Sequence, residues 1–183
     1  MRYLLLPFTH GIDKEAIDQS LALARNLSAC LVCVALIPLR PGSNKGVRLE
    51  YIQQAKDFLE YTRHRAKRAG VTLERMELRT SHLENCILHI SKEMDNAPIL
   101  LFTRGEQSIM LDTSMIISLM ENKHSCYYLV LLTQRNGSIT LPRILFPLLK
   151  KYEGTPDEPV LRFATPHVAS SPFPPSGRFR RQI

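Results

Sequence analysis

The chain has 183 residues, 44% of them hydrophobic, and a formal net charge of +7, which fits one soluble domain with an appendage. It has no apolar stretch near the roughly 20 residues that a membrane-spanning helix needs, and its N-terminus lacks a signal-peptide pattern. We therefore expect a cytoplasmic protein whose four cysteines are thiols, with membrane association unlikely.

The positive charge is concentrated near the C-terminus. Residues 139–183 contain seven Lys/Arg and three Asp/Glu, so this segment carries +4 of the net charge. The run Arg63 to Arg68 lies at the end of a predicted helix, where cations are stabilising. A solvated helix face is therefore preferred to a nucleic-acid site, and we expect no nucleic-acid partner.

Apolar strands and amphipathic helices alternate along the first 133 residues. Asp13 is placed to cap the first helix, and Gly70 to end the second. Helices are predicted at about 14–27, 52–69, 83–94 and 112–122, and strands at 3–6, 29–36, 71–80, 99–102 and 127–132. Residues 103–106 are predicted to form a loop after the central strand.

This order predicts an α/β fold, with a five-stranded, mainly parallel, doubly wound sheet of the Rossmann-like type. Residues 1–135 are assigned to the domain. Residues 136–183 contain eight of the twelve prolines and are predicted to be a basic extension that is largely extended or disordered.

Three local features resemble the universal stress protein family: the first strand ending in proline (LLLPFT), the segment NAPILLFT, and a last helix followed directly by an apolar strand. The resemblance covers residues 1–133. It implies the fold of that family, a role in a stress response, and a homodimer formed through the last strand, Tyr127 to Leu132.

Nucleotide-binding members have an aspartate after the first strand, a G-x-x-G loop after the fourth, and a glycine with a serine or threonine at the next helix. The aspartate position falls on Thr9, and the loop glycines fall on Thr103 and Glu106, with Gly105 out of step by one. The later pair falls on Thr113 and Ser114, so Ser114 alone matches. Glycines let backbone N–H groups approach phosphate oxygens. The resemblance therefore implies a variant that does not bind ATP in the usual way.

A candidate pocket can still be placed at the carboxyl ends of the strands, where ligands bind in doubly wound folds. ATP or AMP is its possible but disfavoured ligand, and no cofactor is expected. Its residues are Pro7, Thr9, Leu36, Thr103, Arg104, Gly105, Thr113 and Ser114.

No catalytic or metal-ligating residue is expected. Cys30 and Cys33 have C-x-x-C spacing, but they lie in an apolar strand, where residues three apart point to opposite faces. The six histidines lack ligand spacing, and no serine or cysteine has a nucleophile motif. His10, beyond the first strand, is interpreted as a polar loop residue.

These observations predict a non-catalytic, dimeric regulatory or interaction module. Its partner contact would use the last strand, the last helix or the C-terminal extension. The alternative is a small-ligand binder that recognises an adenine nucleotide in the altered pocket. An enzyme such as a weak nucleotide hydrolase is the third possibility. It ranks last because no catalytic base or metal site can be assigned to it.

Overall fold

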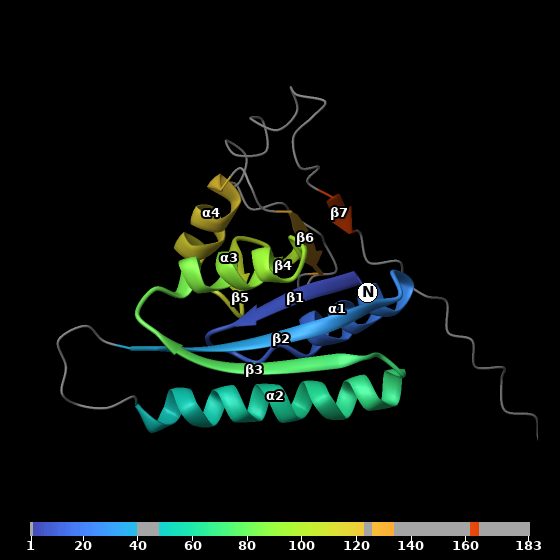
Figure 1. Cartoon of the computed structure of the whole chain (residues 1–183), viewed down its shortest axis with the longest axis horizontal. Helices are drawn as coiled ribbons and strands as arrows, with labels where there is room; N and C mark the ends of the chain where they lie inside the picture. Colours follow the sequence, from blue (N-terminus) through green and yellow to red (C-terminus); the bar gives the residue numbers. More distant parts are fainter. Residues whose placement is uncertain (1, 40–47, 123–125, 134–161, 165–183) are drawn as a thin grey trace, which may run out of the picture.

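The computed structural model describes residues 2–39, 48–122, 126–133 and 162–164. The nine predicted strands and helices occur in this part of the chain in the predicted order (Figure 1). The elements are β1 (Arg2–Phe8), α1 (Lys14–Asn26), β2 (Ala29–Pro38), α2 (Leu49–Ala69), β3 (Leu73–Thr80), α3 (Leu83–Glu93), β4 (Ile99–Arg104), β5 (Gln107–Ile109), α4 (Thr113–Glu121), β6 (Tyr127–Leu132) and β7 (Arg162–Ala164).

The strands form one sheet in the order β3-β2-β1-β4-β6-β7, with every neighbour on this path parallel. The predicted α/β class is therefore confirmed, and all five predicted strands form. Two short strands were not predicted. β5 pairs antiparallel with β4, and β7 pairs with the outer edge of β6.

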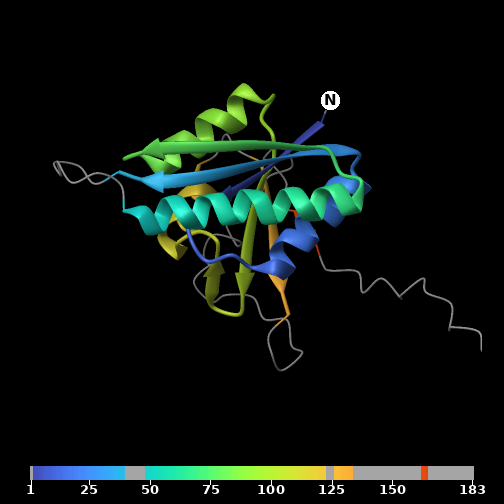
Figure 2. The same cartoon turned by 90° about the horizontal axis from the view of Figure 1, so that it is seen from below.

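Helices cover both faces of the sheet. α1 and α2 lie on one face, and α3 and α4 lie on the other (Figures 1 and 2). Side chains of β1 divide accordingly, because successive residues of a strand point to opposite faces. Leu4 and Leu6 pack with α1 and α2, whereas Leu5 packs with α3 and α4. The nine buried residues at the start of β2 explain its unbroken apolar run.

The local signals at two helix ends are confirmed. Asp13 is the N-cap of α1, and its Oδ1 accepts a hydrogen bond from the Ala16 amide at 2.9 Å. Gly70 ends α2 with φ of 66°, a left-handed conformation that glycine adopts without steric cost. These caps fix where α1 begins relative to β1 and where α2 ends relative to β3.

Most of the predicted extension, residues 136–183, lies outside the described residues, and so does the proposed tail surface. The exception is the backbone of β7. Among the helices that the structure describes, none is long and apolar enough to cross a membrane.

Candidate functional site

The candidate residues lie at the carboxyl end of the sheet, around the neighbouring strands β1 and β4. From β1 the sheet order continues to β2 in one direction, and from β4 it continues to β6 in the other. Open α/β sheets bind ligands in the crevice that opens at such a switch point. In this chain the crevice is the space between the carboxyl ends of β1 and β4. Whether a ligand can bind there depends on which segments of the chain already occupy it.

A β-hairpin made of β4 and β5 occupies this space. β6 pairs with one edge of β4 over all six residues, so the opposite edge is shared by β1 and β5. β1 pairs there once, Leu5 with Ile99, and β5 pairs from Phe102 to Arg104. Met110, which follows β5, contacts the residue after β1. Its carbonyl accepts hydrogen bonds from the Thr9 amide at 2.8 Å and from the Thr9 hydroxyl at 3.0 Å. Backbone from the chain itself therefore bridges the two strands.

Gly105 makes the hairpin turn. Arg104 pairs with Gln107, so the loop contains only Gly105 and Glu106. Gly105 has φ of 60° and is the only one of these two with positive φ, which is the pattern of a type II′ turn. The predicted loop at 103–106 is therefore confirmed at Gly105 and Glu106 and wrong at its first two positions. Thr103 and Arg104 belong to β4, and the glycine that falls out of step with a phosphate loop serves a tight turn.

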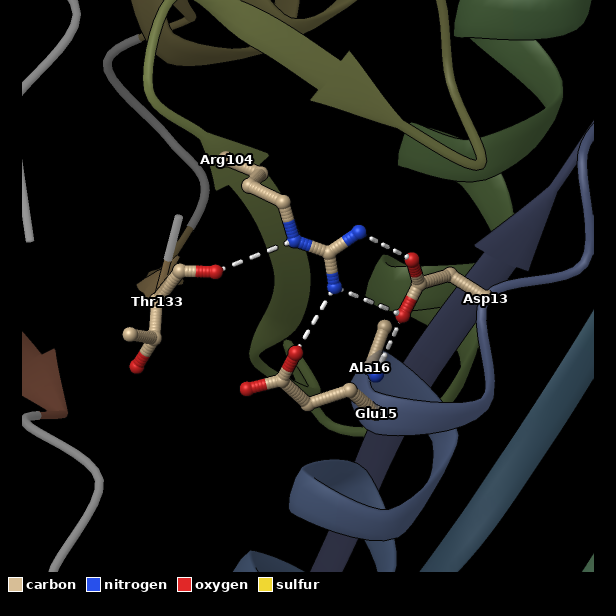
Figure 3. Close-up of polar contacts among 5 residues, drawn as sticks. All are labelled: Asp13, Glu15, Ala16, Arg104 and Thr133. Atoms are coloured by element: carbon tan, nitrogen blue, oxygen red, sulfur yellow. Dashed lines mark hydrogen bonds and ion pairs between the residues drawn. The ribbon is translucent and has the colours of Figure 1, made fainter. Parts of the chain in front are cut away.

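Arg104 joins three parts of the fold at this end of the sheet (Figure 3). Its Nη1 donates to Oδ2 of Asp13 at 2.8 Å, and its Nη2 donates to Oε2 of Glu15 at 2.7 Å and to Oδ1 of Asp13 at 3.3 Å. Its Nε donates to the Thr133 carbonyl at 3.2 Å. One guanidinium therefore ties the end of β4 to the start of α1 and to the residue after β6. We call Arg104, Asp13 and Glu15 the Arg104 cluster.

The electrostatics of the Arg104 cluster oppose an incoming anion. Burial alone would lower the pKa of Arg104, but hydrogen bonds and charge from Asp13 and Glu15 outweigh it and raise that pKa above its ordinary value. One cation faces two carboxylates, so the cluster carries net negative charge. The carboxylates also sit at the N-terminus of α1, whose positive potential would otherwise attract a phosphate.

Thr9, His10 and Asp112 superficially resemble a nucleophile, base and acid. The Thr9 hydroxyl lies 2.8 Å from Nδ1 of His10, and His10 Nε2 lies 3.7 Å from Asp112. A carbonyl can only accept, so Thr9 donates its proton to Met110 and receives the hydrogen bond from His10. Because Thr9 is also only 7% exposed, this geometry positions a loop and offers no activated hydroxyl.

The remaining candidate residues do not gather into one pocket. Pro7 and Leu36 are buried within β1 and β2, and Leu36 packs in the core beneath α3 and α4. The Thr113 hydroxyl donates to the Ser108 hydroxyl at 3.0 Å, joining α4 to β5. Ser114 is exposed in the first turn of α4. Thr103 is 3% exposed, and its hydroxyl has no hydrogen-bond partner within the part of the chain that the structure describes.

The thiols and polar clusters give no sign of metal binding. Cys30 and Cys33 are buried in β2, and burial raises the pKa of each thiol. In the described ranges, no group of three or more His, Cys, Asp or Glu side chains could hold a metal ion.

Two cavities in the described part of the chain lie away from the candidate residues. One of about 470 Å³ lies at the amino ends of the strands, between Tyr3, Leu27 and Cys126. The other, about 310 Å³, lies between α1 and α2 beside Arg65, which donates to Asp18 at 2.6 and 2.8 Å. Neither is lined by a residue of the candidate pocket.

Two features of this site are not predicted from the sequence. Asp13 is predicted as a helix cap, but no signal in the sequence pairs Asp13 or Glu15 with Arg104. The strand β5 is also not predicted, although Gly105-Glu106 between two short stretches is a two-residue hairpin signal.

The fold and site together define a doubly wound α/β domain whose switch-point crevice is bridged by its own hairpin. No protein-family model and no curated protein matches the sequence. Solved structures do match. A universal stress protein from Archaeoglobus fulgidus has 16% identity and a TM-score of 0.56, with 70% of this chain and 93% of that chain covered. A protein of the universal stress protein family from Burkholderia pseudomallei has 14% identity and a TM-score of 0.50, with 69% and 95% covered.

A third match, a universal stress protein in complex with cAMP, has 16% identity and a TM-score of 0.41, with 51% of this chain and 70% of that chain covered. The first two of these structures show that this chain has the universal stress protein fold, as the sequence resemblance implies. At these identities the likeness concerns the fold.

Proposed function

We propose that this chain is a non-catalytic interaction module of the universal stress type, which works in the cytoplasm as a homodimer and does not bind ATP in the usual way. The observation that carries the proposal is the β4–β5 hairpin between the carboxyl ends of β1 and β4. A nucleotide at the switch point would have to displace this hairpin and the hydrogen bonds from Thr9 to Met110.

The Arg104 cluster supports the same conclusion. Arg104 is the cation best placed to meet a phosphate at the end of β4, but its three nitrogens already donate to Asp13, Glu15 and Thr133. Freeing it would leave two carboxylates beside a polyanion. The cost of breaking these contacts and the remaining repulsion both act against phosphate binding.

We place the main protein contact on β6 rather than on α4. The apolar side chains of α4 are used internally, since Ile116, Leu119 and Met120 are buried in the core. β6 is an uncharged strand, YYLVLL, at the end of the sheet path where β7 covers three of its six positions. An apolar edge of this kind is a template for strand pairing between chains.

A titration of the full chain with ATP, AMP and cyclic AMP, followed by calorimetry, tests the proposal that the chain does not bind nucleotides in the usual way. We expect no saturable heat with any of them. A matched pair of variants sharpens the result: Arg104→Ala removes the cation at β4, and Arg63→Ala removes an exposed cation on α2. Micromolar binding that Arg104→Ala weakens and Arg63→Ala does not would refute the proposal.

A second candidate, the altered adenine nucleotide site, is favoured by one observation. The buried Thr103 hydroxyl has no partner among the described residues, although buried polar groups are usually paired. The same titration decides between the two functions: if Thr103→Val abolishes a binding signal of the wild-type chain, the small-ligand function replaces the interaction function.

A further inference from the structure

The two edges of the sheet are protected in different ways. β3 forms one edge, and exposed charged residues, including Arg75, Glu77 and Arg79, lie along it. Arg75 lies 2.5 Å from Glu60 of α2, and Arg79 lies 3.7 Å from Glu77. Charges along an edge strand discourage pairing with another chain. This edge is therefore blocked by its own side chains.

β6 has no such protection. None of its six residues is charged, and its protection among the described residues comes from β7. The pairs are Tyr128 with Arg162, Leu129 with Phe163, and Val130 with Ala164, so half of β6 is covered. Figure 1 shows β7 beside β6, at the end of the sheet farthest from β3. The pairing demonstrates that this edge accepts a strand.

β7 is a weak cover for energetic reasons. It is three residues long and parallel, and a parallel ladder is slightly less stable per residue than an antiparallel one. Residues 133–161 separate β7 from β6 in the sequence, so the pairing also has to offset the chain entropy that is lost when two distant segments are brought together. A strand held by so few contacts can be exchanged for a longer one.

We propose that β7 is an intramolecular cap that competes with a second copy of the chain for the edge of β6. This inference rests on the homodimer of the proposed function and adds a control on it. Two copies of β6 can pair antiparallel about a two-fold axis, which places Leu129 of one copy opposite Val130 of the other. Such a ladder extends over up to six residues per copy, twice the length that β7 covers.

The competition changes the dimer affinity by a predictable factor. If capping has an equilibrium constant K, the fraction of each copy ready to pair is 1/(1 + K), and the apparent dissociation constant rises by (1 + K)². A cap constant of about 10 would therefore weaken dimerisation roughly a hundredfold. Even a small equilibrium constant for capping therefore shifts the balance between monomer and dimer.

The test compares the full chain with Phe163→Pro. Proline removes the backbone N–H at the centre of β7 and disfavours the ladder. The matched control is Ser170→Pro, which adds a proline outside β7. Adding Leu131→Lys to Phe163→Pro places a charge on β6 and blocks pairing at that edge. Thermal unfolding of each variant checks that the domain is folded.

Sedimentation equilibrium over a wide concentration range gives the monomer–dimer midpoint. We expect Phe163→Pro to lower the midpoint concentration at least tenfold relative to both wild type and Ser170→Pro, and Leu131→Lys to restore the monomer. If wild type and Phe163→Pro dimerise at the same midpoint, the cap is refuted while the dimer stands. If both remain monomeric at the highest concentration, the proposed dimer is refuted with it.

Discussion

Replacing Arg104 by glutamine should destabilise the domain measurably, because it breaks the link between β4 and α1. The side chains of Arg104, Asp13 and Glu15 are 30%, 17% and 41% exposed, so the ion pairs are partly screened by water. Exposed pairs contribute about 0.2–1 kcal/mol each, and the less exposed Asp13 pair belongs at the upper end of that range. Glutamine would also leave the carboxylates of Asp13 and Glu15 without their cation, and we estimate a total loss of about 1.5 kcal/mol.

Urea and thermal unfolding, monitored by circular dichroism, measure this loss. For a chain of this size the predicted fall in Tm is roughly 3–6 °C. Arg63→Gln is the matched control, because the Arg63–Glu60 pair at 2.9 Å is about half exposed on both sides. It should cost less than about 0.5 kcal/mol.

A double-mutant cycle with Asp13→Asn isolates the pair, since asparagine still caps a helix. We expect a coupling energy of about 1 kcal/mol between positions 13 and 104. A coupling near zero, or an effect of Arg104→Gln no larger than that of Arg63→Gln, would refute the argument that this cluster holds the crevice closed.

Two further predictions concern the hairpin and the buried thiols. Gly105→Ala should cost roughly 1–2 kcal/mol in urea unfolding, because alanine at φ of 60° is strained; an unchanged midpoint would exclude the type II′ turn. In a Cys86→Ser/Cys126→Ser variant, native Cys30 and Cys33 should resist a thiol reagent at pH 8 and react only after unfolding. Burial raises the pKa of each, which depletes the reactive thiolate, so rapid reaction in the folded state would contradict their core placement.

Much of the fold could be predicted from the sequence because its signals are local. β2 reads as a buried strand from an unbroken apolar run, and α2 reads as a helix from its spacing and from Gly70 at its end. Asp13 is recognisable as a cap from its position alone. Each of these signals depends on residues only a few positions apart.

The site was harder to predict because its contacts are distant along the chain. Arg104 is 91 residues from Asp13 and 89 from Glu15, so no spacing rule relates them. β5 and β7 have three residues each, too few for a two-residue period to be distinguished from chance. Glycine scarcity indicated that the usual phosphate loop is absent, but it could not reveal the hairpin that stands in its place.

Titrating the isotope-labelled full chain with ATP tests the central claim most directly, because backbone amide signals report both binding and its location. We predict no saturable shift at the amides of Thr9, Gly105 and Ser114, since the hairpin and the Arg104 cluster occupy the crevice between β1 and β4. Saturable shifts at these three amides with micromolar affinity would contradict the account.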